Sequence, residues 1–230
     1  MIPRELIDTA KVPDGAELRL FRRGGDFMIV LDRNELMNSR MSGSEEALAT
    51  MTCDRLGDRK TPHLLIGGYG MGFTLRAALA ALGPDARITV VELVPEIIEW
   101  ARGPMAELTA GCLDDPRVRL ILGDVAAVID AAKGSYDAIL LDVDNGPDGL
   151  TRDANGVLYA KRGLAAARAA LRPDGVLAVW SAAPDNIFKR RLTSAGFTVD
   201  EVVVRARGND KGPRHVIWFA AKRVNPPNWA

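Results

Sequence analysis

The 230-residue chain is poor in the residues that build disulfide frameworks and metal centres. Its two cysteines, Cys53 and Cys112, lie far apart and outside any Cys-x-x-Cys spacing, and its two histidines are His63 and His215. This composition argues against a disulfide scaffold and against a structural zinc site. We therefore expect no bound metal.

An excess of charge of either sign is also missing, as are long apolar runs. Thirty Lys and Arg residues balance thirty Asp and Glu residues, so no global field attracts nucleic acid or an anionic membrane. No stretch approaches the length of a membrane span, and the first residues have no apolar core of signal-peptide length. We expect a soluble, cytoplasmic protein that binds neither nucleic acid nor membrane.

From about residue 61 onward, apolar runs alternate with segments of helical pattern. The runs predict strands at 63–67, 87–92, 118–122, 138–142, 176–180, 198–205 and 215–221. The segments between the earlier strands are rich in Ala and Leu and end at Gly or Pro, which predicts helices at 74–82, 95–102, 125–132, 158–171 and 184–195. Continuous apolar runs such as 138–141 are typical of strands buried on both faces.

This alternation predicts a Rossmann-like, doubly wound α/β fold with a seven-stranded, mostly parallel sheet. The last two strands have no helix between them and should form an antiparallel hairpin. We expect residues 1–60 to form a small separate region. Two short apolar runs at 17–21 and 27–31 predict a β-hairpin, and a helix is predicted to begin near Ser44. We expect the larger domain to span 61–223 and the last residues, 224–230, to form a tail.

Four glycines interrupt the apolar run at 64–75: Gly67, Gly68, Gly70 and Gly72. A strand that ends in such a loop exposes bare backbone and a helix N-terminus to a ligand. The dinucleotide fingerprint G-x-G-x-x-G fails, because its third glycine would fall on Phe73 or Leu75. The last three glycines instead match the G-x-G-x-G loop of the class I S-adenosylmethionine-dependent methyltransferase fold. The alternative is an ordinary tight turn from strand to helix.

Acidic residues end the next three predicted strands. Glu92 can accept both ribose hydroxyls of an adenosine, which needs an acceptor-only group. In the methyltransferase fold, the position of Asp124 holds the adenine amino group and that of Asp142 faces the reacting carbon. Each could instead be a solvated strand end, and Asp124 could cap the helix that begins at Val125. Their shared place at the carboxyl edge of the sheet favours a ligand site.

The resemblance implies a cofactor-binding set at this edge. Its members are Gly67, Gly68, Tyr69, Gly70, Gly72, Glu92, Leu93, Asp124, Val125 and Asp142.

Residues 66–180 resemble one branch of this fold, the spermidine synthase (polyamine aminopropyltransferase) family. The matching motifs cover about half the chain: Ile66-Gly67-Gly68, Val91-Glu92-Leu93, Asp115-Pro116-Arg117-Val118, Gly123-Asp124, Tyr136-Asp137-Ala138-Ile139, Gly146-Pro147, Leu158-Tyr159 and Arg172-Pro173-Asp174-Gly175. The resemblance implies a transferase that uses S-adenosylmethionine or its decarboxylated form, a small-molecule acceptor such as a polyamine, and a homodimer.

Departures from the family pattern affect the substrates. The family's glycine loop holds an aspartate where Gly70 stands here, and that charge would repel the carboxylate of intact S-adenosylmethionine. The family's Asp-x-x-Asp pair is shortened to Asp142 and Asp144, with Asn145 in the usual second position. The N-terminal glutamine and tyrosine that hold the polyamine in the family have no clear counterparts. Polyamine specificity is therefore expected to be lost or changed.

Both reactions of this fold displace a group from a carbon attached to a sulfonium. The protein must align the reactants, exclude water and take a proton from an amine nucleophile. We assign Asp142 as general base or ammonium anchor, with Asp144 as its helper. The segment at 145–156 is interpreted as a closing lid, with an ordinary surface loop as the alternative. Tyr159 either contacts the acceptor or packs in the core.

Three functions follow from these observations. The first is methyl transfer from S-adenosylmethionine to a small acceptor such as an amine, and it is the principal prediction because Gly70 removes the charge filter. The second is aminopropyl transfer from the decarboxylated cofactor with an altered choice of amine. The third is a non-catalytic protein that binds the cofactor or keeps the fold for dimer assembly.

Overall fold

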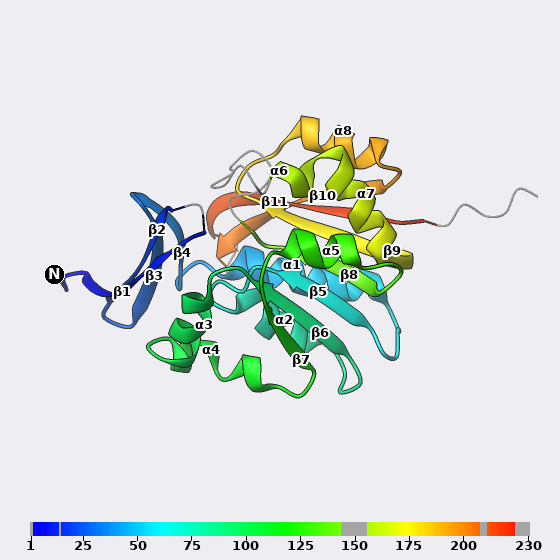
Figure 1. The fold of residues 1–230 in the computed structure, drawn as a ribbon. Helices are drawn as coiled ribbons and strands as arrows, with labels where there is room; N and C mark the ends of the chain where they lie inside the picture. Colours follow the sequence, from blue (N-terminus) through cyan, green and yellow to red (C-terminus); the bar gives the residue numbers. More distant parts are fainter. Residues whose placement is uncertain (1, 14, 144–155, 208–210, 224–230) are drawn as a thin grey trace, which may run out of the picture.

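The computed structural model describes residues 2–223 except 14, 144–155 and 208–210. A four-stranded antiparallel sheet near the N-terminus stands beside a larger α/β unit (Figure 1). Its strands lie in chain order: β1 (Glu5–Lys11), β2 (Glu17–Arg23), β3 (Asp26–Leu31) and β4 (Asn34–Asn38). The predicted hairpin is confirmed as β2 and β3, which pair from Leu18 with Leu31 to Arg23 with Asp26. The outer strands β1 and β4 were not predicted.

The larger unit is built on a seven-stranded sheet with the order β10-β11-β9-β8-β5-β6-β7. The strands are β5 (His63–Gly67), β6 (Arg87–Glu92), β7 (Val118–Leu122), β8 (Tyr136–Leu141), β9 (Leu171–Ser181), β10 (Thr198–Arg207) and β11 (Lys211–Ala221). Strands β5 to β9 run parallel, whereas β11 pairs antiparallel with both β9 and β10. The predicted doubly wound sheet with an antiparallel end is confirmed.

Helices cover both faces of this sheet (Figure 1). They are α1 (Gly43–Leu56), α2 (Phe73–Ala81), α3 (Pro95–Arg102), α4 (Ala106–Thr109), α5 (Val125–Ala131), α6 (Gly156–Tyr159), α7 (Lys161–Ala170) and α8 (Asn186–Ser194), with a short 3₁₀ turn at Cys112–Asp114. The side chains of successive β5 residues point to opposite faces of the sheet. Leu64 and Ile66 pack in the core under α1, α2 and α3, whereas Leu65 packs under α5, α7 and α8.

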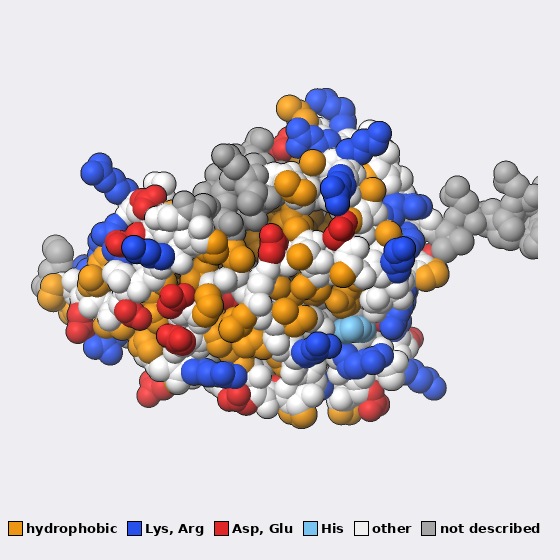
Figure 2. Space-filling view, viewed as in Figure 1, with side chains coloured by type: hydrophobic (Ala, Val, Ile, Leu, Met, Phe, Trp, Pro, Cys, Tyr) orange, Lys and Arg blue, Asp and Glu red, His pale blue; other side chains and the backbone are white. Residues whose placement is uncertain are grey.

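The N-terminal sheet shares the first of these two cores. Leu18, Leu20 and Ile29 of its inner face belong to the same buried cluster as Leu48 of α1 and Ile97 of α3. Figure 2 shows hydrophobic side chains where this sheet meets the larger unit. The small sheet is therefore fixed against the same side of the larger unit as α1, α2 and α3.

The predicted helix at 158–171 is wrong in its extent. The chain leaves the helical conformation at Ala160, which separates α6 from α7, and Leu171 already pairs with Tyr136 as the first residue of β9. The Ala-rich segment has high helix propensity throughout, so its composition does not mark these breaks. Pairing with β8 decides where the helix ends.

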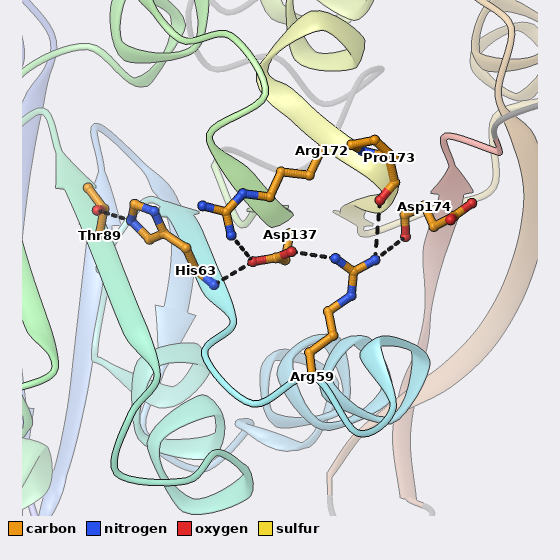
Figure 3. A network of polar contacts seen from close by, with 7 residues as sticks. All are labelled: Arg59, His63, Thr89, Asp137, Arg172, Pro173 and Asp174. Atoms are coloured by element: carbon orange, nitrogen blue, oxygen red, sulfur yellow. Dashed lines mark hydrogen bonds and ion pairs between the residues drawn. The ribbon is translucent and has the colours of Figure 1, made fainter.

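A buried carboxylate joins three segments at the amino edge of the larger sheet. Asp137 of β8 accepts hydrogen bonds from the backbone N–H of His63 at 2.8 Å and from Arg172 at 2.7 Å, and it pairs with Arg59 (Figure 3). Arg59 also donates to the carbonyl oxygens of Pro173 and Asp174. The acid of the Tyr-Asp motif therefore connects the α1–β5 link, β8 and β9.

Replacing Asp137 with Ala should lower the free energy of unfolding by about 3 kcal/mol. This is the low end of the range for removing one partner of a buried ion pair, because Arg59 and Arg172 are each about one-third exposed. Denaturant unfolding followed by circular dichroism measures the loss. Asp130→Ala, which removes an exposed 3.6 Å pair with Arg162, is the control and should cost less than about 1 kcal/mol. Equal losses would contradict this role of Asp137.

Candidate active site

A cleft lies where the carboxyl ends of β5, β6, β7 and β8 meet the N-terminal sheet. Its volume, with the open mouth included, is about 890 Å³. The larger unit contributes Gly68, Gly70, Val91, Glu92, Leu93, Val94, Ile97, Gly123, Asp124, Val125, Asp142 and Val143 to its lining. The N-terminal sheet and its loops contribute Val12, Ala16, Leu18, Ile29, Leu31, Leu36 and Met37. The cleft is therefore mostly apolar with three carboxylates.

The loop after β5 needs its glycines for close contact. Gly68 has φ +86°, and a Cβ there would collide with the carbonyl oxygen of Asp142. Gly72 has φ +76° and immediately precedes α2. The side chain of Tyr69 turns away from the cleft, so that its hydroxyl lies 3.4 Å from the Cys112 sulfur. Tyr69 therefore serves the site through its backbone.

Glu92, at the end of β6, is buried with both carboxylate oxygens in use. Oε2 accepts from the N–H of Tyr69 at 2.8 Å, and Oε1 accepts from the N–H of Val94 at 2.9 Å. Burial raises the pKa of Glu92, while these backbone donors oppose the shift. Each oxygen keeps a further lone pair. Glu92 can thus hold the loop and still accept two hydroxyl groups from a ligand beside Leu93.

Asp124 both caps a helix and faces the cleft. Its Oδ1 accepts from the N–H of Ala126 at 2.8 Å, so the capping alternative is confirmed. The residue is exposed and lines the cleft, which leaves Oδ2 able to accept a donor from a ligand. The next residue, Val125, packs tightly on Gly67. A Cβ on Gly67 would lie 2.8 Å from a Val125 methyl carbon.

Asp142 follows β8 and lies beside the glycine loop. Its N–H donates to the Gly67 carbonyl at 3.0 Å, which extends the pairing of β8 with β5. Its carboxylate accepts from the Thr74 hydroxyl of α2 at 2.6 Å. Burial raises the pKa of Asp142 to about 6, and the Thr74 bond opposes the rise. A carboxylate with this pKa can act as a base near neutral pH.

A second buried acid beside Asp142 was not predicted. Glu45, in the first turn of α1, is 7% exposed and accepts from the Ser44 hydroxyl at 2.6 Å. Burial and the nearby charge of Asp142 raise the pKa of Glu45 to about 8. Ser44 in turn lies 2.8 Å from Nδ1 of His215 on β11. Within the described residues, neither Glu45 nor Asp142 forms an ion pair with Lys or Arg.

A sequence signal for Glu45 existed. The buried residues of α1 recur at helical spacing after it, at Leu48, Ala49, Thr52 and Leu56. This spacing places Glu45 on the apolar face of the helix, where an acid is unexpected. The sequence analysis predicts the helix start near Ser44 and assigns Glu45 no role in the site.

Met37 of the N-terminal sheet occupies the space over Gly70. A Cβ at Gly70 would lie 2.6 Å from the Met37 methyl carbon. A thioether thus stands near the place where the family pattern would bring an aspartate side chain. The contact joins segments that are distant in the sequence, and no local pattern indicated it.

The remaining predicted residues lie elsewhere. Asp144, Asn145 and the predicted lid at 145–156 fall outside the described residues, apart from Gly156, which begins α6. Tyr159 is 1% exposed, stacks edge-on with Phe188 and brings its hydroxyl within 3.4 Å of the Val143 carbonyl. It supports the segment that follows β8 from the core and is not among the residues that line the cleft.

With this geometry in place, comparison with known proteins identifies the family. Residues 46–190 match the spermine/spermidine synthase domain. The chain belongs to the spermine/spermidine synthase family. It is 29% identical over 203 residues to a polyamine aminopropyltransferase of Mycobacterium tuberculosis, which covers 87% of this chain and 36% of the relative. It is 39% identical over 115 residues to putrescine N-methyltransferase 4 of Nicotiana tabacum, which covers 50% and 28%.

The fold agrees with a solved relative of the family. The crystal structure of spermidine synthase from Thermotoga maritima superposes with a TM-score of 0.77 at 22% identity, covering 96% of this chain and 74% of that one. The chain spans only about a third of the length of the curated relatives that it matches. These comparisons favour the aminopropyltransferase alternative over methyl transfer, which the sequence analysis had placed first.

Among the residues that the structure describes, no helix is long and apolar enough to cross a membrane. No three His, Cys, Asp or Glu side chains among them lie close enough together to hold a metal ion.

Replacing Glu45 with Gln should flatten the pH dependence of stability. Because the pKa of Glu45 is about 8 in the folded chain and ordinarily 4.5, folding favours its protonated form. That contribution is complete below pH 4.5 and is lost as the pH rises through 8. Wild type should lose up to about 1.4 kcal/mol of unfolding free energy per pH unit from this group.

Urea unfolding between pH 5 and pH 9 tests this expectation. Glu45→Gln should gain stability relative to wild type as the pH rises, whereas the exposed neighbour variant Glu46→Gln should follow the wild-type curve. Parallel curves for wild type and Glu45→Gln would show that Glu45 is ionised at neutral pH.

Proposed function

We propose that this chain is an aminopropyltransferase that binds decarboxylated S-adenosylmethionine and transfers its aminopropyl group to a small amine. The observation that carries the proposal is Glu92, a buried carboxylate at the end of β6 that faces the cleft and retains acceptor capacity. Its position suits the two hydroxyls of a ribose. Membership of the spermine/spermidine synthase family supports the same conclusion.

The other residues of the cleft fit the remaining parts of an adenosyl sulfonium. Val94, Ile97 and Val125 offer an apolar surface for an adenine ring, and Asp124 can accept from its amino group. Gly68 and Gly70 have no side chains and line the cleft, so the aminopropyl tail of the cofactor can lie against their backbone. The residues present are therefore compatible with the cofactor.

In such a reaction the cofactor supplies the leaving group, and the chain's own residues handle the proton and exclude water. The bound sulfonium supplies an activated carbon, because the thioether is a ready leaving group. Asp142 takes a proton from the attacking ammonium or holds it in line. The apolar inner face of the N-terminal sheet, with Leu18, Ile29 and Met37, excludes water from the cleft.

Methyl transfer from intact S-adenosylmethionine is the second candidate. One observation favours it: Gly70 carries no carboxylate, and Met37 fills the adjoining space. A relative named putrescine N-methyltransferase matches half of the chain. Both reactions would use the same cofactor frame and the same base.

Calorimetric titration and a product assay distinguish the candidates. Wild type should bind decarboxylated S-adenosylmethionine more tightly than the intact form and should convert 1,4-diaminobutane to its aminopropyl product. Glu92→Gln should weaken binding of either form about tenfold to hundredfold, because two charge-assisted hydrogen bonds are lost. Glu99→Gln, an exposed acid of α3, is the control and should bind normally. Equal binding by both variants would refute the placement of the ribose.

The charge at position 70 provides a second test. Gly70→Asp alone should bind either cofactor poorly, because the new side chain meets Met37, although φ +56° is a conformation that Asp and Asn adopt. Adding Met37→Ala should restore binding and place a carboxylate against the tail. The ratio of dissociation constants, intact over decarboxylated, should then rise at least about tenfold. The Gly70→Asn, Met37→Ala variant is the uncharged control, and the same ratio in both double variants would contradict the argument.

A further inference from the structure

Polar groups continue from the cleft through the first turn of α1 to β11. Asp142 lines the cleft, its charge acts on Glu45 of α1, and Ser44 connects Glu45 to His215 of β11 through contacts of 2.6 and 2.8 Å. Thr74 places the two residues next to each other, since its hydroxyl donates to the Asp142 carboxylate at 2.6 Å and lies 3.4 Å from the backbone carbonyl oxygen of Glu45. His215 is only partly buried. The series therefore connects the cleft with a residue that solvent can reach.

The proposed reaction needs such a connection because it releases a proton. Transfer to a protonated amine forms a C–N bond and breaks a C–S bond, whose electron pair remains on sulfur as a neutral thioether. The ammonium gives one proton to Asp142 before its nitrogen attacks, and the product amine keeps the others. One proton per turnover must therefore leave Asp142. This step rests on the proposed function.

We propose that Glu45 shares one proton with Asp142 and passes the reaction's proton through Ser44 to His215. Glu45 acts through Asp142 and does not touch the substrate. The Ser44 hydroxyl can carry out the transfer because it is both donor and acceptor. When Glu45 is ionised, Ser44 donates to it and accepts from Nδ1–H of His215. When Glu45 is protonated, both bonds reverse.

The surroundings of Glu45 suit this exchange. Burial lowers the pKa of His215, so the ring is neutral near pH 7 and one nitrogen can accept a proton. The groups that face the pair are the hydroxyls of Ser44 and Thr74, the ring of His215, and the exposed carboxylate of Glu46. None of these groups carries a fixed positive charge. If Glu45 and Asp142 were both ionised, their negative charges would repel each other without compensation, so the pair retains one proton.

Infrared spectroscopy of the ligand-free protein tests the shared proton without requiring activity. Wild type at pH 7 should give the carbonyl band of a protonated carboxyl group, shifted by deuteration. Glu45→Gln should lack the Glu45 band and Glu46→Gln should keep it. Identical spectra for wild type and Glu45→Gln would overturn the proposal. A wild-type band in a protein that does not bind decarboxylated S-adenosylmethionine would support the shared proton and refute the proposed function.

Steady-state kinetics with decarboxylated S-adenosylmethionine and 1,4-diaminobutane test the path. Ser44→Ala should lower kcat about tenfold to hundredfold, with the KM for the cofactor unchanged, and Ser44→Thr should recover most of the loss. Wild type should show two steps in its pH profile, and Glu45→Gln should lack the upper step, near pH 8. An unchanged kcat in Ser44→Ala, or an unchanged profile in Glu45→Gln, would overturn the path.

Discussion

The site depends on the close approach of the loop after β5 to the end of β8. Gly68 lies so near the Asp142 carbonyl that no side chain fits between them. This contact fixes the loop, so that the N–H of Tyr69 points at Glu92 and α2 begins where Thr74 reaches Asp142. One backbone contact thus positions Glu92, Asp142 and the start of α2. A larger residue at position 68 would separate all of them together.

The acids at the two edges of the sheet, of which Asp137 and Glu45 are buried and Asp142 is half-buried, have different partners. Asp137, at the amino edge, is surrounded by Arg59 and Arg172, and such compensation is typical of a structural ion pair. Asp142 and Glu45, at the opposite edge, have hydroxyl partners and no ion pair among the described residues. The second arrangement raises the pKa of both acids and leaves negative charge available to a cationic ligand.

Much of the larger unit could be predicted because its central strands β5, β6 and β8 are buried on both faces and even the edge strand β7 is a short apolar run. Strands β5, β6 and β7 begin and end at the predicted residues, and Glu92 follows from the end of its strand. Strand β1 could not be found this way, since most of its residues are exposed and give no apolar run. Met37 over Gly70 depends on packing between distant segments, which no local pattern encodes. Glu45 was missed although Leu48, Ala49, Thr52 and Leu56 follow it at helical spacing, which places it on the buried face of α1.

The loss of an acid at position 70 does not remove charge selection from the cleft. If Asp142 and Glu45 share one proton, as proposed, the pair carries about one negative charge beside the glycine loop. A decarboxylated tail carries an ammonium alone, whereas the intact tail adds a carboxylate that this charge repels. Charges within about 10 Å interact without full screening, and burial strengthens the effect. An acid pair in this position would favour the amine tail without an acid in the glycine loop, as the proposed aminopropyl transfer requires.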